Sequence, residues 1–183
     1  MTAVEPDVVH VTFDHELEDY MDSRGLHYEV IDGTIVVNAA ASFAHEDVAS
    51  TLLVILANAA PAELVVLGSH FGFYYEQGCF LLADITVARR ADCSPDGIHV
   101  APQLVVEVLS PSTRWKDLGR KREIYEQAGV PSYWVVDPIA QTLTVLSLQD
   151  GSYVESDRLT GQGQLSVDRP YPLTLMPFVR STP

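Results

Sequence analysis

Residues 104–136 read LVVEVLSPSTRWKDLGRKREIYEQAGVPSYWVV, and this stretch decides the fold. Its first six residues form an apolar run with the length and composition of a buried strand. A helix is predicted over 110–128, where a Ser-Pro-Ser-Thr segment opens it and Gly129 ends it. A second strand is predicted over 132–136. Strand, helix and strand in this order form a βαβ unit.

The segments around this unit predict further strands, hairpins and two more helices. An Asp-Gly pair at positions 32–33 lies between two apolar runs, which is a strong signal for a tight hairpin. The predicted elements are helices over 12–24 and 43–60, a hairpin of 27–31 with 34–38, strands over 64–68, 71–75 and 80–88, a loop over 89–102, a hairpin of 141–147 with 152–156, and an irregular or edge-strand tail. This order predicts an α/β (α+β) fold with a mixed β-sheet flanked by helices, in one domain over 1–183 with a loose lead-in over 1–10.

The composition is that of a globular chain and excludes a disordered, coiled-coil or transmembrane protein. Of its 183 residues 47% are apolar and 20% charged. The longest apolar runs, such as 51–60 and 64–67, are far shorter than the ~20 residues of a membrane-spanning helix. The N-terminal MTAVEPDVVH has neither a basic start nor an apolar stretch, so we expect a cytoplasmic protein with no membrane partner. Cys79 and Cys93 are expected to be free thiols, as suits a reducing compartment.

The chain is strongly acidic, with 25 Asp and Glu against 11 Lys and Arg, so its formal net charge is −14. A field of this sign repels phosphate backbones and counts against nucleic-acid binding. Five basic residues nevertheless cluster within nine positions and include both lysines of the chain: Arg114, Lys116, Arg120, Lys121 and Arg122. Because salt screens charges beyond ~8–10 Å, this cluster would meet a phosphate backbone locally despite the total charge.

Two predicted strands carry an acid among apolar residues. Asp84 is the one charged residue of 80–88, and Glu107 is the one polar residue of 104–109. A buried carboxylate is costly unless it is paired, protonated or bound to a metal, and two in neighbouring strands repel each other unless a divalent cation lies between them. Hard oxygen ligands suit Mg²⁺ or Mn²⁺. The alternatives are a turn-capping role for Asp84 and a structural ion pair between Glu107 and a basic residue of the following helix.

Lys121 lies on the apolar stripe of the helix predicted over 110–128. Leu118 stands three residues before it and Tyr125 four residues after it, on the same face. Lys121 is therefore expected to point toward the sheet, where a buried lysine needs a negative partner such as the two strand acids. The alternative is a lysine whose stem passes the stripe and whose ammonium group reaches solvent. Two carboxylates, a divalent cation and a lysine together are machinery for phosphodiester hydrolysis.

Four motifs follow one another along the chain: YEVIDG at 28–33, PQLVVEVLSPST at 102–113, Lys121 with Tyr125, and AGVPSYWVVDP at 128–138. In this order and spacing, over about residues 12–178, they resemble the Uma-type putative restriction endonucleases of the PD-(D/E)XK nuclease superfamily. The resemblance implies a restriction-endonuclease-like core. It also implies a metal-dependent endonuclease that hydrolyses phosphodiester bonds in nucleic acid, for which DNA is the expected substrate. Related nucleases often act as pairs, so we expect a homodimer.

The resemblance also implies roles for individual residues. Asp84 and Glu107 would be the metal-binding pair, with Mg²⁺ or Mn²⁺ as the cofactor. The superfamily pattern places a lysine two residues after the glutamate; here that lysine would have moved to Lys121. Glu29 and His45 match further positions that recur in the family, so Glu29 would contact the metal or a water, and His45 a phosphate. The alternatives are a salt bridge within the hairpin for Glu29 and a helix-surface position for His45.

Two other functions are weighed against the nuclease. The acidic surface and the lack of a recognisable DNA-reading segment also suit a catalytically silent interaction module on the same scaffold. In that case Tyr74, Tyr75 and Phe80 are candidates for a protein interface. A two-carboxylate glycosidase would need a sugar cleft lined with aromatic side chains. The chain has only Trp115 and Trp134, and we expect Trp134 in the core, which disfavours this function.

Overall fold

Two parallel strands form the centre of the structure. In a computed structural model of the chain, the described residues are 20, 21, 23–38, 40–69 and 71–178. Strand β9 (Leu104–Val108) pairs in parallel with β10 (Ser132–Asp137), and two short helices connect them. The predicted βαβ unit is therefore confirmed. The predicted lead-in over 1–10 and most of the predicted helix over 12–24 lie outside the described residues.

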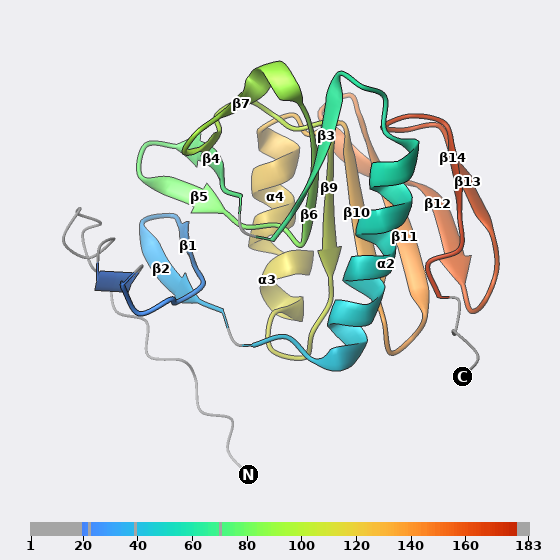
Figure 1. The fold of residues 1–183 in the computed structure, drawn as a ribbon, viewed down its shortest axis with the longest axis horizontal. Coiled ribbons are helices and arrows are strands. Elements are labelled where there is room, and N and C mark those ends of the chain that lie inside the picture. Colours follow the sequence, from blue (N-terminus) through green and yellow to red (C-terminus); the bar gives the residue numbers. More distant parts are fainter. Residues whose placement is uncertain (1–19, 22, 39, 70, 179–183) are drawn as a thin grey trace, which may run out of the picture.

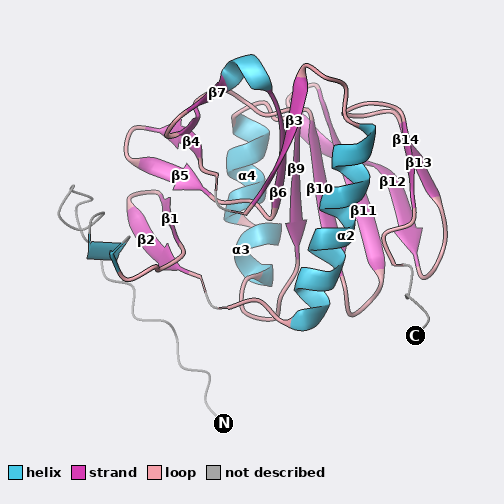
Figure 2. Cartoon of the chain, in the orientation of Figure 1, coloured by secondary structure: helices cyan, strands magenta, loops and turns pink. Residues whose placement is uncertain are grey.

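The β9–β10 pair belongs to a mixed sheet of six strands within the described residues (Figures 1 and 2). In spatial order these strands are β12 (Ser152–Thr160), β11 (Thr142–Gln149), β10, β9, β6 (Ile85–Arg89) and β3 (Leu64–Gly68). All neighbours except β9 and β10 run antiparallel. The central sheet thus has the mixed character that the sequence predicts.

A second sheet of six short strands stands beside the first in Figure 1. In spatial order it contains β2 (Thr34–Val37), β1 (Tyr28–Ile31), β5 (Cys79–Leu81), β4 (Phe73–Glu76), β8 (Gly97–Ile98) and β7 (Cys93–Ser94). The last two strands and a 3-10 helix, η1 (Arg90–Asp92), lie in the stretch predicted as a loop, so that prediction is wrong for part of its length. Phe80 is buried and Tyr74 and Tyr75 are half-buried in this sheet, so none of them is a freely exposed interface residue.

The predicted strand over 80–88 is wrong in one respect, because it is two strands in two different sheets. The first ends at Leu81, the second begins at Ile85, and Asp84 lies in the bend between them. The backbone at Leu82 bonds to side chains instead of to a neighbouring strand. Its N–H donates to Glu29 Oε1 and its carbonyl accepts from Lys121 Nζ. Local sequence carries no sign of these two distant partners.

The single helix predicted over 110–128 is also wrong, because it breaks at Gly119 into α3 (Arg114–Leu118) and α4 (Arg120–Gln127). The backbone of Gly119 passes so close to the Trp115 carbonyl that an added Cβ would lie 2.8 Å from that oxygen. On one continuous helix, positions 116 and 121 would face directions about 140° apart. The break lets both side chains turn toward the same partner.

Both hairpins predicted from local turn signals are present. Asp32 and Gly33 join β1 to β2 with φ of 50° and 76°, and Asp150 and Gly151 join β11 to β12 with φ of 49° and 82°. These positive φ values at both turn positions are those of a type I′ hairpin. The second hairpin is longer than predicted, and the tail forms a further small hairpin of β13 (Leu165–Val167) and β14 (Leu173–Leu175).

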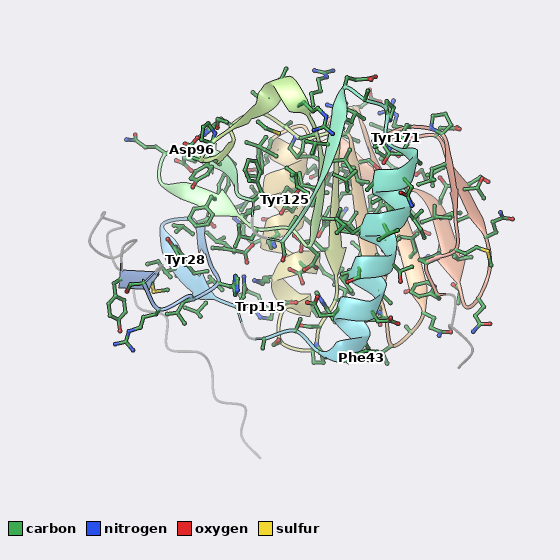
Figure 3. All side chains as sticks on the ribbon, viewed as in Figure 1. Tyr28, Phe43, Asp96, Trp115, Tyr125 and Tyr171 are labelled. Atoms are coloured by element: carbon green, nitrogen blue, oxygen red, sulfur yellow. The ribbon has the colours of Figure 1, made fainter. Side chains whose placement is uncertain are left out.

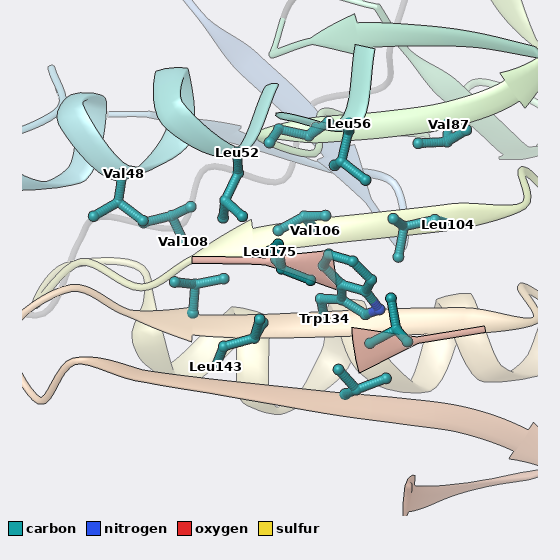
Figure 4. Packing of buried hydrophobic residues seen from close by; sticks show 14 of the residues in the cluster. Val48, Leu52, Leu56, Val87, Leu104, Val106, Val108, Trp134, Leu143 and Leu175 are labelled. Carbon is teal, nitrogen blue, oxygen red and sulfur yellow. The ribbon is translucent and has the colours of Figure 1, made fainter. Parts of the chain in front are cut away.

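Two hydrophobic layers cover the two faces of the central sheet. On one face, helix α2 (Phe43–Ala59) places Leu52 and Leu56 against Val106 and Trp134 (Figure 4), and the β13–β14 hairpin packs on the same cluster. On the other face, the buried residues of α4 pack on the sheet with Val105 and Tyr133. Because side chains alternate along a strand, Glu107 points to the face that α4 covers. Within the described residues, no helix combines the length and the apolarity needed to cross a membrane.

We predict that Gly119→Ala lowers the free energy of unfolding by about 1–3 kcal/mol, because the new Cβ must displace the Trp115 carbonyl. Gly68→Ala is the matched control, since no atom lies within 4 Å of its added Cβ. Urea unfolding of the two variants checks this. If Gly119→Ala is as stable as Gly68→Ala, the fold tolerates a Cβ at position 119 and does not require glycine there.

Candidate functional site

A pocket of about 400 Å³ opens where β9 ends, between the start of α2, helix α3 and strand β1. In Figure 1 the β9 arrow points to this end of the molecule, where α2 begins and α3 lies. Figure 3 places the exposed side chains of Phe43 and Trp115 at this same end. All five residues singled out from the sequence line this one pocket: Glu29, His45, Asp84, Glu107 and Lys121.

Asp84 and Glu107 are brought together by strand register. The last pair between β6 and β9 is Ile85 with Val106, so the next position outward sets Asp84 opposite Glu107. The N–H of Val108 donates to Asp84 Oδ2 at 2.6 Å, which fixes this carboxylate beside the end of β9. Each acid uses one oxygen, Asp84 Oδ2 or Glu107 Oε1, for its hydrogen bonds within the described residues. The second oxygen of each is left for another ligand.

Lys121 points inward and is 2% exposed, so its side chain does not run along the helix to the outer surface but lines the pocket. Its Nζ lies 2.7 Å from Glu107 Oε1, 2.7 Å from Glu29 Oε1 and 2.9 Å from the carbonyl oxygen of Leu82. The hydroxyl of Tyr125, which Figure 3 labels at the centre of the fold, donates to the same Glu107 oxygen at 3.0 Å. The structure therefore joins the helix lysine to the strand acid.

Glu29 is fully buried and receives four donors. Its Oε1 accepts from Lys121 and from the Leu82 N–H at 3.0 Å, and its Oε2 accepts from Lys116 at 2.5 Å and from Asn38 Nδ2 at 3.3 Å. Its ion pairs cross to α3 and α4 and do not stay within the hairpin. With both oxygens occupied, Glu29 has none left for a metal ion.

His45 lies on the first turn of α2, with its side chain buried against Asp84. Its Nε2 is 3.3 Å from Asp84 Oδ2, and this hydrogen bond raises the pKa of the imidazole. Ser42 accepts the His45 N–H and so caps the helix at this point. The Nδ1 atom is buried and has no hydrogen-bond partner among the described residues. His45 therefore belongs to the wall of the pocket and not to the helix surface.

Sequence reasoning missed Lys116, which is 4% exposed and binds Glu29 and, at 2.6 Å, Asn38 Oδ1. Its spacing from Lys121 places it on another face of a continuous helix, so only the break at Gly119 brings it in. One signal was available: Lys116 and Lys121 are the only two lysines of the chain.

The basic cluster does not form a free positive surface. Lys116 and Lys121 are buried in the pocket, Arg114 binds Asp137 at 2.6 Å, and Arg120 binds Asp32 through two hydrogen bonds. Contact of this cluster with a phosphate backbone stays a prediction, and within the pocket it is confined to Lys116 and Lys121. The expected alternative pairing of Glu107 holds for Lys121 and not for Arg120.

The pocket holds more negative than positive charge. Five acidic side chains, those of Glu29, Glu46, Asp84, Glu107 and Asp117, line it together with two lysines. Burial raises the pKa of Glu107 well above its usual range, and the neighbouring Asp117, Asp84 and Glu29 add to this while Lys121 opposes it. Burial likewise raises the pKa of Asp117.

Lys121 is the counterpart of these acids. Desolvation alone would lower the pKa of its ammonium group, but Glu107, Glu29 and Asp117 outweigh that effect and raise the pKa well above its usual range. The lysine is therefore charged at neutral pH. An additional cation at the acids would relieve the remaining surplus of negative charge.

The donor set fits a divalent cation that takes few protein ligands. Within the described residues, no group of three or more His, Cys, Asp or Glu side chains is arranged around a common metal position. Mg²⁺ is commonly held by one or two carboxylates together with waters and substrate phosphates. The free oxygens of Asp84 and Glu107 supply such a pair, and an all-protein zinc or calcium cage is not present in this part of the chain.

Comparison with known proteins agrees with this architecture. Residues 12–176 match the family model described as Uma2, putative restriction endonuclease. Among solved structures, a putative nuclease belonging to DUF820 from Anabaena variabilis superposes with a TM-score of 0.59. It is 16% identical and the match covers 76% of this chain and 80% of that one, so the likeness shows the shared fold. A search of curated proteins finds no match. The expected restriction-endonuclease-like fold is confirmed.

Glu29 generates a pH-dependent prediction. Although burial acts in the opposite direction, Lys121 and Lys116 lower the pKa of its carboxyl from the ordinary 4.5 to about 2. A depressed folded-state pKa stabilises the fold above the unfolded pKa, and this contribution is lost as the pH falls through the folded value. Glu29→Gln should therefore lower the free energy of unfolding by about 3 kcal/mol at pH 7, and the deficit should shrink as the pH falls from 4.5 toward 2.

Urea unfolding between pH 7 and pH 3 measures this difference. Glu63→Gln, which removes an exposed carboxylate outside the pocket, should change stability little at any pH. A Glu29→Gln deficit that stays constant down to pH 3 would contradict the ionised, lysine-paired state of Glu29.

Proposed function

The chain belongs to the Uma2 family of putative restriction endonucleases, and we propose that it is a metal-dependent nuclease that hydrolyses phosphodiester bonds in nucleic acid, with DNA as the preferred substrate. The observation that carries this proposal is the meeting of Asp84, Glu107 and Lys121 in one pocket open to solvent. The preference for DNA rests on the family's description as restriction endonucleases.

Asp84 and Glu107 are the proposed metal-binding residues, with Mg²⁺ or Mn²⁺ as the ion. The surplus of negative charge and the free oxygen on each acid support this role. When bound, a divalent cation polarises the phosphate and makes a nearby water more acidic. Asp84, Glu107 and Lys121 all line the pocket, so a phosphate bound beside the two acids would also lie close to Lys121.

Lys121 is the proposed catalytic lysine. Its Nζ is held by Glu107, Glu29 and the Leu82 carbonyl, so its position is fixed before substrate arrives. A charged, preorganised ammonium group either orients the attacking water or stabilises the negative charge that develops on the phosphate. His45 is proposed as a further contact to substrate phosphate, with its imidazole fixed by Asp84.

The direct test is cleavage of supercoiled plasmid DNA with Mg²⁺ or Mn²⁺. Asp84→Asn, Glu107→Gln and Lys121→Met should each lower the cleavage rate by about 10²-fold or more, because each removes a charge from the reacting centre. Glu123→Gln, which changes an exposed acid on α4, is the control and should cleave like the wild type. A wild type that cuts no faster than Asp84→Asn would refute the nuclease.

Calorimetry separates this function from a catalytically silent interaction module. Mg²⁺ or Mn²⁺ should bind the wild-type protein, and the binding heat should disappear in Asp84→Asn. A folded wild type that binds neither ion and cleaves no DNA or RNA would favour the silent module.

We also propose a homodimer, which the pairing of related nucleases and the open edge of the central sheet support. The nine-residue strand β12 ends that sheet within the described part of the chain. Light scattering at micromolar concentration should give a mass of twice 20.1 kDa. A uniform species of 20.1 kDa would contradict the dimer.

A further inference from the structure

Both lysines of the chain line the pocket. Of its 11 basic residues two are lysines and nine are arginines. Both lysines are almost completely buried, both line the pocket, and both bind Glu29, one at each carboxylate oxygen. Lysine and arginine differ in kind, because the ammonium group is a compact charge with three donors and the guanidinium is a planar fork. Two buried lysines that bind the same acid are therefore a specific feature of the pocket, unlike lysines scattered over a protein surface.

The two ammonium groups face different parts of the pocket. Lys121 Nζ turns toward Glu107 and the Leu82 carbonyl. Lys116 Nζ binds Asn38 Oδ1 in addition to Glu29, which uses two of its three N–H bonds within the described residues. The third is left for a ligand. The hydroxyl groups of Ser110, Ser112 and Thr113 line the same pocket as Lys116 and form hydrogen bonds with one another.

The other cations of α3 and α4 do not compete for this role. Arg114 and Arg120 are held by Asp137 and Asp32, and neither lines the pocket. In a chain of net charge −14, an anionic substrate needs a cation at the point of contact, because the long-range field repels it. Besides Lys121, Lys116 is the one Lys or Arg side chain among the described residues that lines the pocket.

Resting on the nuclease function above, we propose that Lys116 is a second substrate-binding group, which receives a backbone phosphate next to the phosphate at Asp84 and Glu107. Glu29 is the positioning residue that holds both lysines. The Lys116 ammonium group meets the phosphate oxygen as a point charge, and the Ser110–Thr113 hydroxyls supply further donors. Gly119 makes this arrangement possible, because only a broken helix directs residues 116 and 121 to one carboxylate.

The first experiment uses the fact that only two lysines exist. Protein labelled with ¹³C,¹⁵N-lysine gives one set of side-chain signals for each, and Lys116→Arg and Lys121→Arg assign them. Inorganic phosphate is titrated in at constant ionic strength, with and without Mg²⁺. The proposal expects the Lys116 signals to shift saturably with phosphate. Lys116 signals that do not move at any phosphate concentration, in either condition, overturn it.

The second experiment measures cleavage kinetics on a DNA substrate. Lys116→Met should raise KM about 10-fold or more and change kcat less than 3-fold, and Lys116→Arg should recover part of the loss because it keeps the charge. Arg122→Met removes a cation from α4 outside the pocket and should change neither constant. Glu29→Gln should lower kcat and shift both lysine signals, which a purely structural acid remote from the lysines would not do.

The outcomes separate this inference from the nuclease itself. If the wild type cleaves DNA but Lys116→Met keeps its KM, the second binding group is refuted and the nuclease stands. If the wild type cleaves nothing, the phosphate titration still decides whether Lys116 binds the anion. Far-ultraviolet circular dichroism checks that each variant is folded. If Lys116→Met does not fold, the KM of Lys116→Arg is compared with that of the wild type instead.

Discussion

The buried ion pairs of Glu29 with Lys116 and Lys121 hold the pocket together. Glu29 comes from β1 of the second six-stranded sheet, and its lysine partners come from α3 and α4, the two helices that connect β9 to β10. One carboxylate thus joins β1 to two consecutive helices, with 87 positions between Glu29 and Lys116. Burying these charges is costly, and only the full set of partners makes it tolerable. The same contacts that stabilise the fold therefore fix the proposed catalytic lysine.

Charge balance links this fold to its chemistry. Lys121 and Lys116 satisfy Glu29, while Glu107 and Asp117 keep a raised pKa because they are buried near other acids. Acids with a raised pKa are concentrated at functional sites, where a bound cation or a cationic group of the substrate can balance their charge. The overall acidity of the chain has a related effect. Under the proposal above, it restricts anion binding to the pocket, since Arg114 and Arg120 already bind Asp137 and Asp32.

Much of the architecture followed from local sequence, and the features that did not depend mainly on long-range contacts. The βαβ unit and the two Asp-Gly hairpins depend on the spacing of apolar residues and on the turn residues. Both of these are set by neighbouring residues in the sequence. Asp84, Glu107 and Lys121 were found because two acids and a lysine stood in apolar patterns, whereas Glu29 and His45 were found only through the resemblance to the family. The break at Leu82–Asp84 and the recruitment of Lys116 depend on contacts across the fold with Glu29 and Asn38. The break at Gly119 is accompanied by a local close approach to the Trp115 carbonyl, which no apolar period reveals. No periodicity in one segment encodes such partners.

The small C-terminal hairpin has a different kind of consequence. Strands β13 and β14 complete the hydrophobic layer on the α2 face, and the Tyr171 hydroxyl donates to the Leu56 carbonyl there, yet none of their residues lines the pocket. The residues of this hairpin that stabilise the α2 face are thus separate from those that line the pocket. Substitutions within this hairpin therefore act on the thermal stability of the layer and leave the composition of the pocket wall unchanged.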